Sequence, residues 1–250
     1  MKKILIGLMV MFLSLQAEEV YTTFKVHADQ KADLAFDASG AVNKVYVEVS
    51  SVVKKGDVLA ELHNDDLKAS LQIAKAALND AKVSLKFAKR DYDRQVKVKH
   101  LIDESKFDVY ALAYERADVR FKQATAQLAY QQALLNKTKL RAPFDGIIFD
   151  KSVEIGDVVS GMMLRTVFKV QSLNKRKLII AFDQKYWKRI KLGQKYKYSV
   201  DGDKQVYEGV ISKIHPAVNE DNRKINAEIK SEKFVVGLFG EGYIAIPDTK

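Results

Sequence analysis

The sequence predicts an α+β, multi-domain chain: two β-segments, separated by a long antiparallel α-helical hairpin and followed by a small β-barrel. Three observations predict this fold class. Two apolar-alternating segments share the letters Gly-Asp-Val, at residues 56–58 and 156–158. Heptad-spaced apolar residues fill the interval between them, and short strand-like segments follow residue 174. With 250 residues, the chain is long enough for two or three small domains.

Each β-segment, or half, is predicted from alternating apolar residues and a tight turn. The first half alternates at Val42, Val45, Val47, Val49, Val52 and Val53. Gly56 and Asp57 then form a turn, because Gly reaches positive φ and Asp caps its own turn. In the second half, Pro143 ends any helix and Gly156-Asp157 repeats the turn.

Residues 65–138 predict two helices of similar length. Apolar positions spaced alternately four and three apart form a heptad seam at Leu67, Leu71, Ala74, Leu78, Ala81, Leu85, Ala88 and Tyr92. A second seam has the same spacing at Tyr110, Tyr114, Ala117, Phe121, Ala124, Leu128, Gln131 and Leu135. Ser105 followed by Asp108 predicts a capping box at the start of the second helix. Roughly thirty-odd residues a helix give an arm of about 50 Å.

The segment after Asn174 predicts a small β-barrel. Strands are expected at 176–183, 195–200, 206–216, 223–230 and 241–247. A short helix is expected at 184–194, with Trp187 and Ile190 facing inward and Gly193 as its C-cap.

Composition and charge exclude several function classes. The chain has no cysteine, so disulfide scaffolds, thiolate metal sites and cysteine catalysis are excluded. The formal net charge of +10 has three interpretations: a solvated basic surface, attraction to anionic lipid, or attraction to an acidic partner. Nucleic acid is not expected as a partner, because no stacking aromatics lie among the basic residues.

The first 17 residues have the pattern of a secretory signal peptide. Lys2 and Lys3 precede an apolar run from Ile4 to Leu15, and Ala17 offers a cleavage site. The run is short for a membrane span. Leu15 occupies a position where a small residue is usual, so an uncleaved N-terminal anchor stays an alternative.

Together these segments resemble a known family. The letters "LRAPFDGII" and "GDVV", with "GAVNKVYVEVSSVVKKGDVLAEL" before them, resemble the periplasmic adaptors called membrane fusion proteins, or the HlyD-like family. The two halves look like a biotinyl/lipoyl-type β-sandwich cut open at the turn that normally carries the modified lysine. The resemblance runs from about residue 38 to residue 245. The letters "GLFGEGYIAI" stand at the family's turn before the last strand, where Gly240 or Gly242 could serve.

The resemblance divides the chain into four parts. These are a signal peptide at 1–17, a lipoyl-like β-domain at 18–64 plus 139–174, a coiled-coil hairpin at 65–138 and a β-barrel domain at 175–247. Only the letters "PDTK" follow the last strand, so a minimal adaptor is expected.

The resemblance also implies a functional site at the hairpin turn. The family's tip pattern is Arg, three residues, Leu, six residues, Ser; Arg94, Val98 and Ser105 stand at that spacing, with Val in place of Leu. This implies contact with an outer-membrane channel of the TolC type, to which Leu101, Ile102 and Phe107 would add exposed apolar groups. The alternative is ordinary helix-end chemistry, with Ser105 as a cap and Arg94 as a surface charge.

The function implied is that of a non-enzymatic periplasmic adaptor in a tripartite efflux pump. Its expected partners are an inner-membrane transporter, a TolC-type channel and further copies of the chain with hairpins side by side. The transporter is expected to be of the resistance-nodulation-division (RND) type, with an ABC-type exporter as the second choice. No cofactor is expected.

Alternatives outside this class depend on a few residues. A lipoate or biotin carrier would need a modified lysine, and only Lys68 lies near the right place, although at a helix start. An exported structural coiled coil without a transporter is the other alternative. No metal site is expected: the four histidines are scattered, and Met162 and Met163 are expected to pack in the core rather than bind a soft metal.

Overall fold

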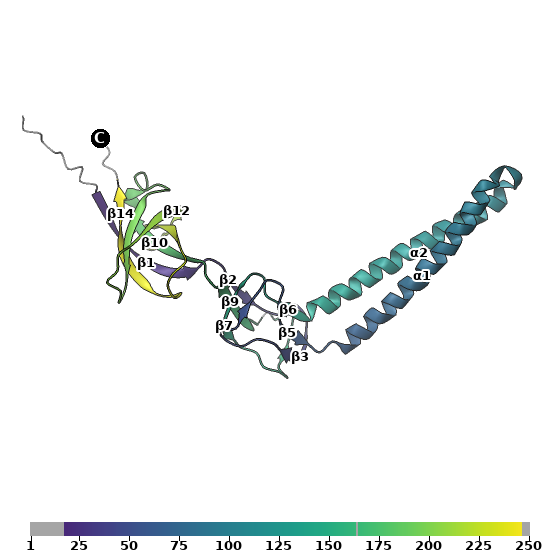
Figure 1. The fold of residues 1–250 in the computed structure, drawn as a ribbon, viewed down its shortest axis with the longest axis horizontal. Coiled ribbons are helices and arrows are strands. Elements are labelled where there is room, and N and C mark those ends of the chain that lie inside the picture. Colours follow the sequence, from purple (N-terminus) through teal and green to yellow (C-terminus); the bar gives the residue numbers. More distant parts are fainter. Residues whose placement is uncertain (1–17, 164, 247–250) are drawn as a thin grey trace, which may run out of the picture. The chain divides into compact units, whose positions relative to one another are not determined.

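The computed structural model describes residues 18–163 and 165–246, so the predicted signal peptide lies outside the described residues. The chain divides into two compact units, one made of residues 1–31 and 171–250 and the other of residues 32–170. The first unit holds a β-barrel, and the second holds two small sheets and a pair of long helices (Figure 1). The predicted combination of two helices and a small barrel is therefore confirmed.

The barrel is closed by six antiparallel strands. In order around the barrel they are β1 (Glu18–Ala28), β10 (Arg176–Asp183), β13 (Lys224–Ser231), β12 (Tyr207–Val218), β11 (Lys195–Val200) and β14 (Phe239–Ile246). Alternate side chains point inward, because successive residues of a strand face opposite sides. The interior holds Phe24, Ile180, Tyr196, Ile229 and Ile244, each at most 3% exposed.

The first strand corrects the assignment of residues 18–64 to the sandwich. β1 lies between β10 and β14 and closes the barrel, with Phe24 opposite Ile180 on one side and Gly240 on the other. Its buried residues alternate, as a strand with one side in a core requires. Because β1 pairs with both β10 and β14, the barrel has no exposed sheet edge, and this favours the position of β1 in the barrel.

Two details of the barrel differ from the prediction. A three-residue 3₁₀ turn, η2 (Gln184–Tyr186), replaces the expected helix; Ile190 is 3% exposed, as predicted, but Trp187 is 63% exposed. The rings of Phe24, Tyr196 and Tyr198 already fill the interior, so the smaller Ile190 takes the inward place.

The turn before the last strand is also different. It is made by Gly237, which has a φ of +100°. Gly240 and Gly242 lie within β14, against the rings of Phe24 and Tyr196, where any Cβ would collide.

The sandwich consists of two four-stranded sheets. One has the order β2 (Lys31–Leu34), β9 (Phe168–Ser172), β7 (Gly146–Lys151) and β4 (Val52–Val53). The other has the order β6 (Lys139–Arg141), β5 (Val58–Leu62), β3 (Gly40–Val45) and β8 (Val158–Val159). Each sheet therefore combines strands from before and after the helices.

The two Gly-Asp turns match each other closely. Gly56 and Gly156 have φ values of +94° and +95°. The N–H of Lys54 donates to the Asp57 carboxylate at 2.8 Å, and the second turn repeats this bond at 3.2 Å. The N–H of Gly56 donates to the carbonyl of Ala142, and that of Gly156 donates to the carbonyl of Val42. Each half thus closes on the other, although they are far apart along the chain.

The two long helices are α1 (Asp65–Lys97) and α2 (Glu104–Lys137), with the 3₁₀ turn η1 (Lys99–Leu101) between them. We call these three elements the helix pair; they pack side by side (Figure 1). All eight predicted seam residues of α1 are buried or half-buried. On α2, Tyr110 is exposed, and Phe107 and Ala111 continue the inner face instead. No helix among residues 18–163 and 165–246 is long and apolar enough to cross a membrane.

A buried polar network fixes the base of the helix pair to the sandwich. The Asn64 side-chain amide donates to Glu61 at 2.7 Å and to the Thr138 hydroxyl at 2.9 Å. That hydroxyl donates to the carbonyl of Leu135 at 2.7 Å. Asn64 and Thr138 are 1% and 3% exposed, so these hydrogen bonds form away from water, and among the described residues the Asn64 Oδ1 has no hydrogen-bond partner.

Candidate functional site

The candidate site is the tip of the helix pair, residues 94–105. α1 ends at Lys97, and the N–H of Val98 caps it by donating to the carbonyl of Gln95 at 3.1 Å. Ile102 is extended, with φ −125° and ψ 154°, and reverses the chain. α2 begins after Asp103, whose carbonyl accepts from Lys106 and Phe107. The predicted Ser105 capping box is wrong, because Asp103 is the cap and Ser105 lies inside the first turn.

Three aromatic rings in contact hold the helices together just below the tip. Tyr92 lies between Tyr114, with ring centroids 5.2 Å apart, and Phe107, at 5.6 Å. The ammonium group of Lys99 lies 4.5 Å from the centroid of the Phe107 ring. Such ring pairs and cation–π contacts stabilise the approach of the two helices. Phe107 is therefore half-buried in this cluster and not the exposed group that was expected.

The predicted site residues lie around the tip but differ in exposure. The Arg94 side chain is 64% exposed and pairs with Asp91 at 3.5 Å. Leu101 is 73% exposed and Val98 is 37% exposed. Ser105 is exposed, whereas Ile102 is half-buried. The strongest apolar contact that the tip can offer a partner is therefore Leu101.

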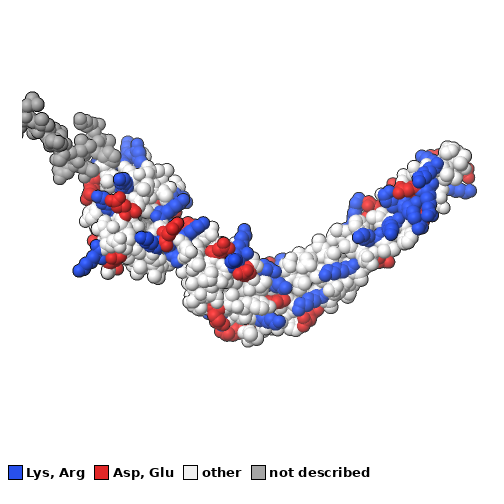
Figure 2. All heavy atoms as spheres, viewed as in Figure 1, with Lys and Arg blue, Asp and Glu red and all other residues white. Residues whose placement is uncertain are grey.

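A basic band follows α1 toward the tip, where Figure 2 shows Lys and Arg side chains gathered. It consists of Lys86, Lys89, Arg90, Arg94 and Lys97, which line a shallow groove together with Asp93. Asp93 accepts from Lys89 at 2.8 Å, and this hydrogen bond with its charge raises the pKa of Lys89. The signal that could have found this band is the spacing of Lys86, Arg90, Arg94 and Lys97, which lie four, four and three residues apart on one face of the helix.

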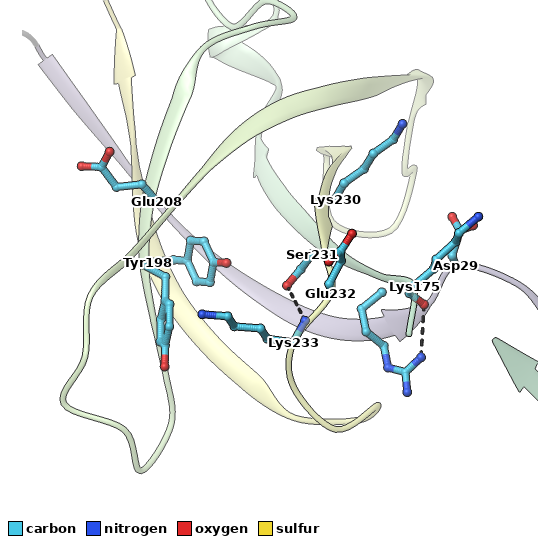
Figure 3. Close-up of a pocket in the computed structure, with 10 residues that line it drawn as sticks. Asp29, Lys175, Tyr198, Glu208, Lys230, Ser231, Glu232 and Lys233 are labelled. Atoms are coloured by element: carbon cyan, nitrogen blue, oxygen red, sulfur yellow. Dashed lines mark hydrogen bonds between the residues drawn. The ribbon is translucent and has the colours of Figure 1, made fainter. Parts of the chain in front are cut away.

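The barrel has a cavity of about 620 Å³ that sequence reasoning missed (Figure 3). The rings of Tyr198 and Tyr207 stack there at 5.7 Å, and the Lys233 ammonium lies 5.6 Å from the Tyr207 centroid. Burial raises the pKa of Tyr198, so that its phenol stays neutral. Cations and carboxylates alternate around the rest of the lining: Asp29, Lys175, Arg176, Glu208, Lys230, Glu232 and Lys233.

The described residues contain no group of three or more His, Cys, Asp or Glu side chains that could hold a metal ion. His215 lies 2.9 Å from Glu228, but Lys177 and Lys213 complete that cluster at 3.7 and 4.0 Å, which makes it an ion-pair network.

The expected burial of Met162 and Met163 is wrong. Their exposed fractions are 94% and 78%. Val159 is the last buried residue of β8, and the turn that follows leads away from the core.

Lys68 is an ordinary helix-surface lysine in this structure. It lies in the first turn of α1, and its ammonium group pairs with Asp65 at 3.0 Å. A carrier lysine stands at a strand turn, which is a different position.

Comparison with known proteins gives the same family as the sequence pattern. The family model described as CzcB-like, barrel-sandwich hybrid domain matches residues 30–171. The cobalt-zinc-cadmium resistance protein CzcB of Cupriavidus metallidurans is 24% identical over 215 residues, which are 82% of this chain and 40% of CzcB. The macrolide export protein MacA of Yersinia pestis is 25% identical over 226 residues, which are 83% of this chain and 61% of MacA. The chain thus spans less than two thirds of the length of either relative.

The fold is also that of a solved chimeric protein. A MacA–MexA chimera carrying the Pseudomonas aeruginosa MexA α-hairpin domain superposes with a TM-score of 0.77 and 24% identity. The match covers 94% of this chain and 84% of the chimera. The resemblance to membrane fusion proteins is confirmed, and the chain belongs to the family of proteins with a CzcB-like barrel-sandwich hybrid domain.

Proposed function

We propose that this chain is the periplasmic adaptor subunit of a tripartite efflux pump. It would link an inner-membrane transporter to a TolC-type outer-membrane channel and so give toxic compounds a closed path outward. It is exported to the periplasm in this proposal and has no catalytic role of its own. The names of the relatives, which concern metal resistance and macrolide export, support an efflux role without fixing the substrate.

The observation that carries the proposal is the helix pair built into the sandwich. The two helices, of 33 and 34 residues, span about 50 Å at 1.5 Å per residue. Buried hydrogen bonds fix their base at Asn64 and Thr138, and the Tyr92 ring cluster fixes their far end. The sandwich itself we interpret as a lipoyl-type fold opened at its turn, from which the arm extends. A stiff arm with an exposed tip suits a protein that bridges two partners.

The working unit in this proposal is a ring of copies with their hairpins side by side. The basic band on α1 and the exposed acids of α2, such as Glu115, offer charge complementarity between neighbouring hairpins. The barrel would dock on the transporter, for which an RND-type pump is our first choice and an ABC-type exporter our second. A protonophore separates these two, because it stops a proton-driven pump directly.

Deleting the gene tests the efflux role. Sensitivity to drugs, bile salts and metal ions is expected to rise in the deletion strain and to return to normal when the gene is restored on a plasmid. Unchanged sensitivity to all of these would favour a structural coiled-coil protein instead.

The carrier alternative has its own test. The intact mass of the chain purified from its native host should show no lipoyl or biotinyl group. A prosthetic group on Lys68 would overturn the adaptor proposal.

A further inference from the structure

One end of the barrel carries an exposed segment that is both apolar and basic. We call residues 184–195 the basic loop. Trp187 and Leu192 in this loop are 63% and 64% exposed. The loop contains no acidic residue, and its cations are Lys185, Lys188, Arg189, Lys191 and Lys195.

Trp187 is exposed on a loop that the barrel holds in place. The loop is anchored in the barrel by Ile190, which is 3% exposed. The N–H groups of Arg189 and Ile190 both donate to the carbonyl of Tyr186, at 2.9 and 3.0 Å. The N–H of Gly193 donates to the carbonyl of Ile211 at 2.9 Å, which ties the other side of the loop to β12. The barrel therefore presents Trp187 to the surroundings in a fixed place.

Aromatic rings and ammonium groups alternate on this surface. The Lys188 ammonium lies 5.2 Å from the centroid of Trp187, and the Lys185 ammonium lies 4.9 Å from that of Tyr186. Trp and Tyr concentrate at membrane–water interfaces, where their rings sit at headgroup level. Lysines beside them meet lipid phosphates and keep their apolar stems against the ring surface.

The basic loop lies at the end of the barrel where the chain enters. The Arg189 guanidinium pairs with the Glu18 carboxylate at 2.6 Å. Glu18 begins β1 and stands opposite Ile246, the last residue of β14. The apolar run Ile4–Leu15 ends three residues before Glu18. In the proposed function this run is an export signal, which would bring this end of the barrel close to the membrane.

Nearby acids do not cancel the charge of the loop. Glu18 offsets Arg189, and the turn between β12 and β13 adds Glu220 and Asp221. That turn adds Arg223 as well, whose carbonyl accepts from Gln184 at 3.1 Å. The Asp183 carboxylate, directly before the loop, accepts from the backbone N–H of Lys185 at 2.8 Å. Four exposed lysines of the loop form no ion pair with the described residues, so the surface favours an anionic partner.

We propose that the basic loop binds the surface of an anionic lipid bilayer, with Trp187 and Leu192 at headgroup level and the lysines on lipid phosphates. This contact would orient the barrel end directly on the membrane and needs neither the transporter nor the channel. The lipid contact could therefore be absent while the proposed adaptor function is correct. The lipid contact could equally be present while the adaptor function is wrong.

Trp187 is the only tryptophan of the chain, so its fluorescence reports on this loop alone. The full chain is mixed with vesicles of phosphatidylcholine and phosphatidylglycerol. The expected result is a blue shift of the emission, quenching by brominated phosphatidylcholine in the same vesicles, and reversal by high salt. Vesicles of phosphatidylcholine alone should give a much smaller shift. Emission that stays at the value of a water-exposed indole on both vesicle types would overturn the proposal.

Variants separate this loop from the N-terminal run and from the general basic charge. Combined Lys185→Glu, Lys188→Glu and Lys191→Glu should weaken vesicle binding in sedimentation on the order of 100-fold. Combined Lys54→Glu, Lys75→Glu and Lys82→Glu, three exposed lysines outside both the basic loop and the basic band, changes the net charge equally and should leave binding within a factor of a few. Equal weakening by both sets, or by neither, would contradict the proposal. If the Trp187 emission shifted to the blue only after a transporter was added, the loop would bind protein rather than lipid.

Discussion

Asn64 and Thr138 show at the residue scale how the helix pair is joined to the sandwich. Both side chains are buried, and the Asn64 amide donates to the Thr138 hydroxyl in a hydrogen bond of 2.9 Å. Removing one partner would leave the other buried without its bond, which costs more than the bond contributes when present.

Asn64→Ala is therefore expected to lower the free energy of unfolding by about 1–3 kcal/mol, and Thr138→Val by a similar amount. Urea denaturation followed by circular dichroism measures this. Asn79→Ala, at an exposed position of α1, is the matched control and should change stability by less than about 0.5 kcal/mol. Equal stability of Asn64→Ala and Asn79→Ala would show that the network does not fix the base.

Glu228 links stability to pH. Burial alone would raise its pKa, but the hydrogen bond with His215 and the charges of Lys177 and Lys213 lower it below the ordinary 4.5. A carboxyl group with a lowered folded-state pKa contributes stability above its unfolded pKa. That contribution is lost as the pH falls through the folded-state pKa.

Glu228→Gln should therefore reduce stability at about pH 7 and reduce it less, or not at all, at about pH 3. Thermal unfolding across this range checks the expectation. Glu208→Gln, whose side chain is 60% exposed beside Lys197, is the control and should show little pH-dependent difference. If Glu228→Gln lowered the stability by the same amount at both pH values, the electrostatic explanation would be contradicted.

At the scale of elements, local patterns were predicted well and long-range partners were not. The spacing of four and three placed all eight α1 seam residues inward, because a heptad depends only on neighbouring turns. β1 was assigned to the wrong domain, because its partners β10 and β14 lie at the far end of the sequence. Trp187 and Met162 were expected inside, since hydrophobicity alone does not say whether a core is already full. The Tyr92 cluster contains residues of both helices, so the residue spacing within one helix could not indicate it.

The tip makes a prediction at this scale. Replacing Arg94 or Ser105 with Glu should abolish efflux in the complemented deletion strain while leaving the fold intact. The reason is that the new carboxylate would lie within the proposed contact between the tip and the channel. Ser84→Glu, at an exposed position within α1, is the control and should support normal efflux. Circular dichroism and purification yield show whether each variant folds. Normal efflux by the Arg94 and Ser105 variants would show that these tip residues do not form the proposed contact with the channel.

For the whole molecule, the predictable part was the order of the elements. The Gly-Asp turns 100 residues apart predicted that the two segments belong together, and each sheet indeed combines strands from before and after the helices. Partners and substrate could not be predicted in the same way, since the proposed adaptor role needs no deep substrate site that a motif could mark. In the proposed function, the length of the helix pair and its exposed tip are the features that matter.

The most direct test of the adaptor account is site-specific photo-crosslinking in living cells. A photoreactive amino acid at Leu101, the most exposed apolar residue of the tip, is compared with the same amino acid at Ser84. The account predicts a crosslink from position 101 to a TolC-type outer-membrane protein, identified by mass spectrometry, and none from position 84. A position 101 crosslinked only to other proteins, or not at all while efflux is normal, would contradict it.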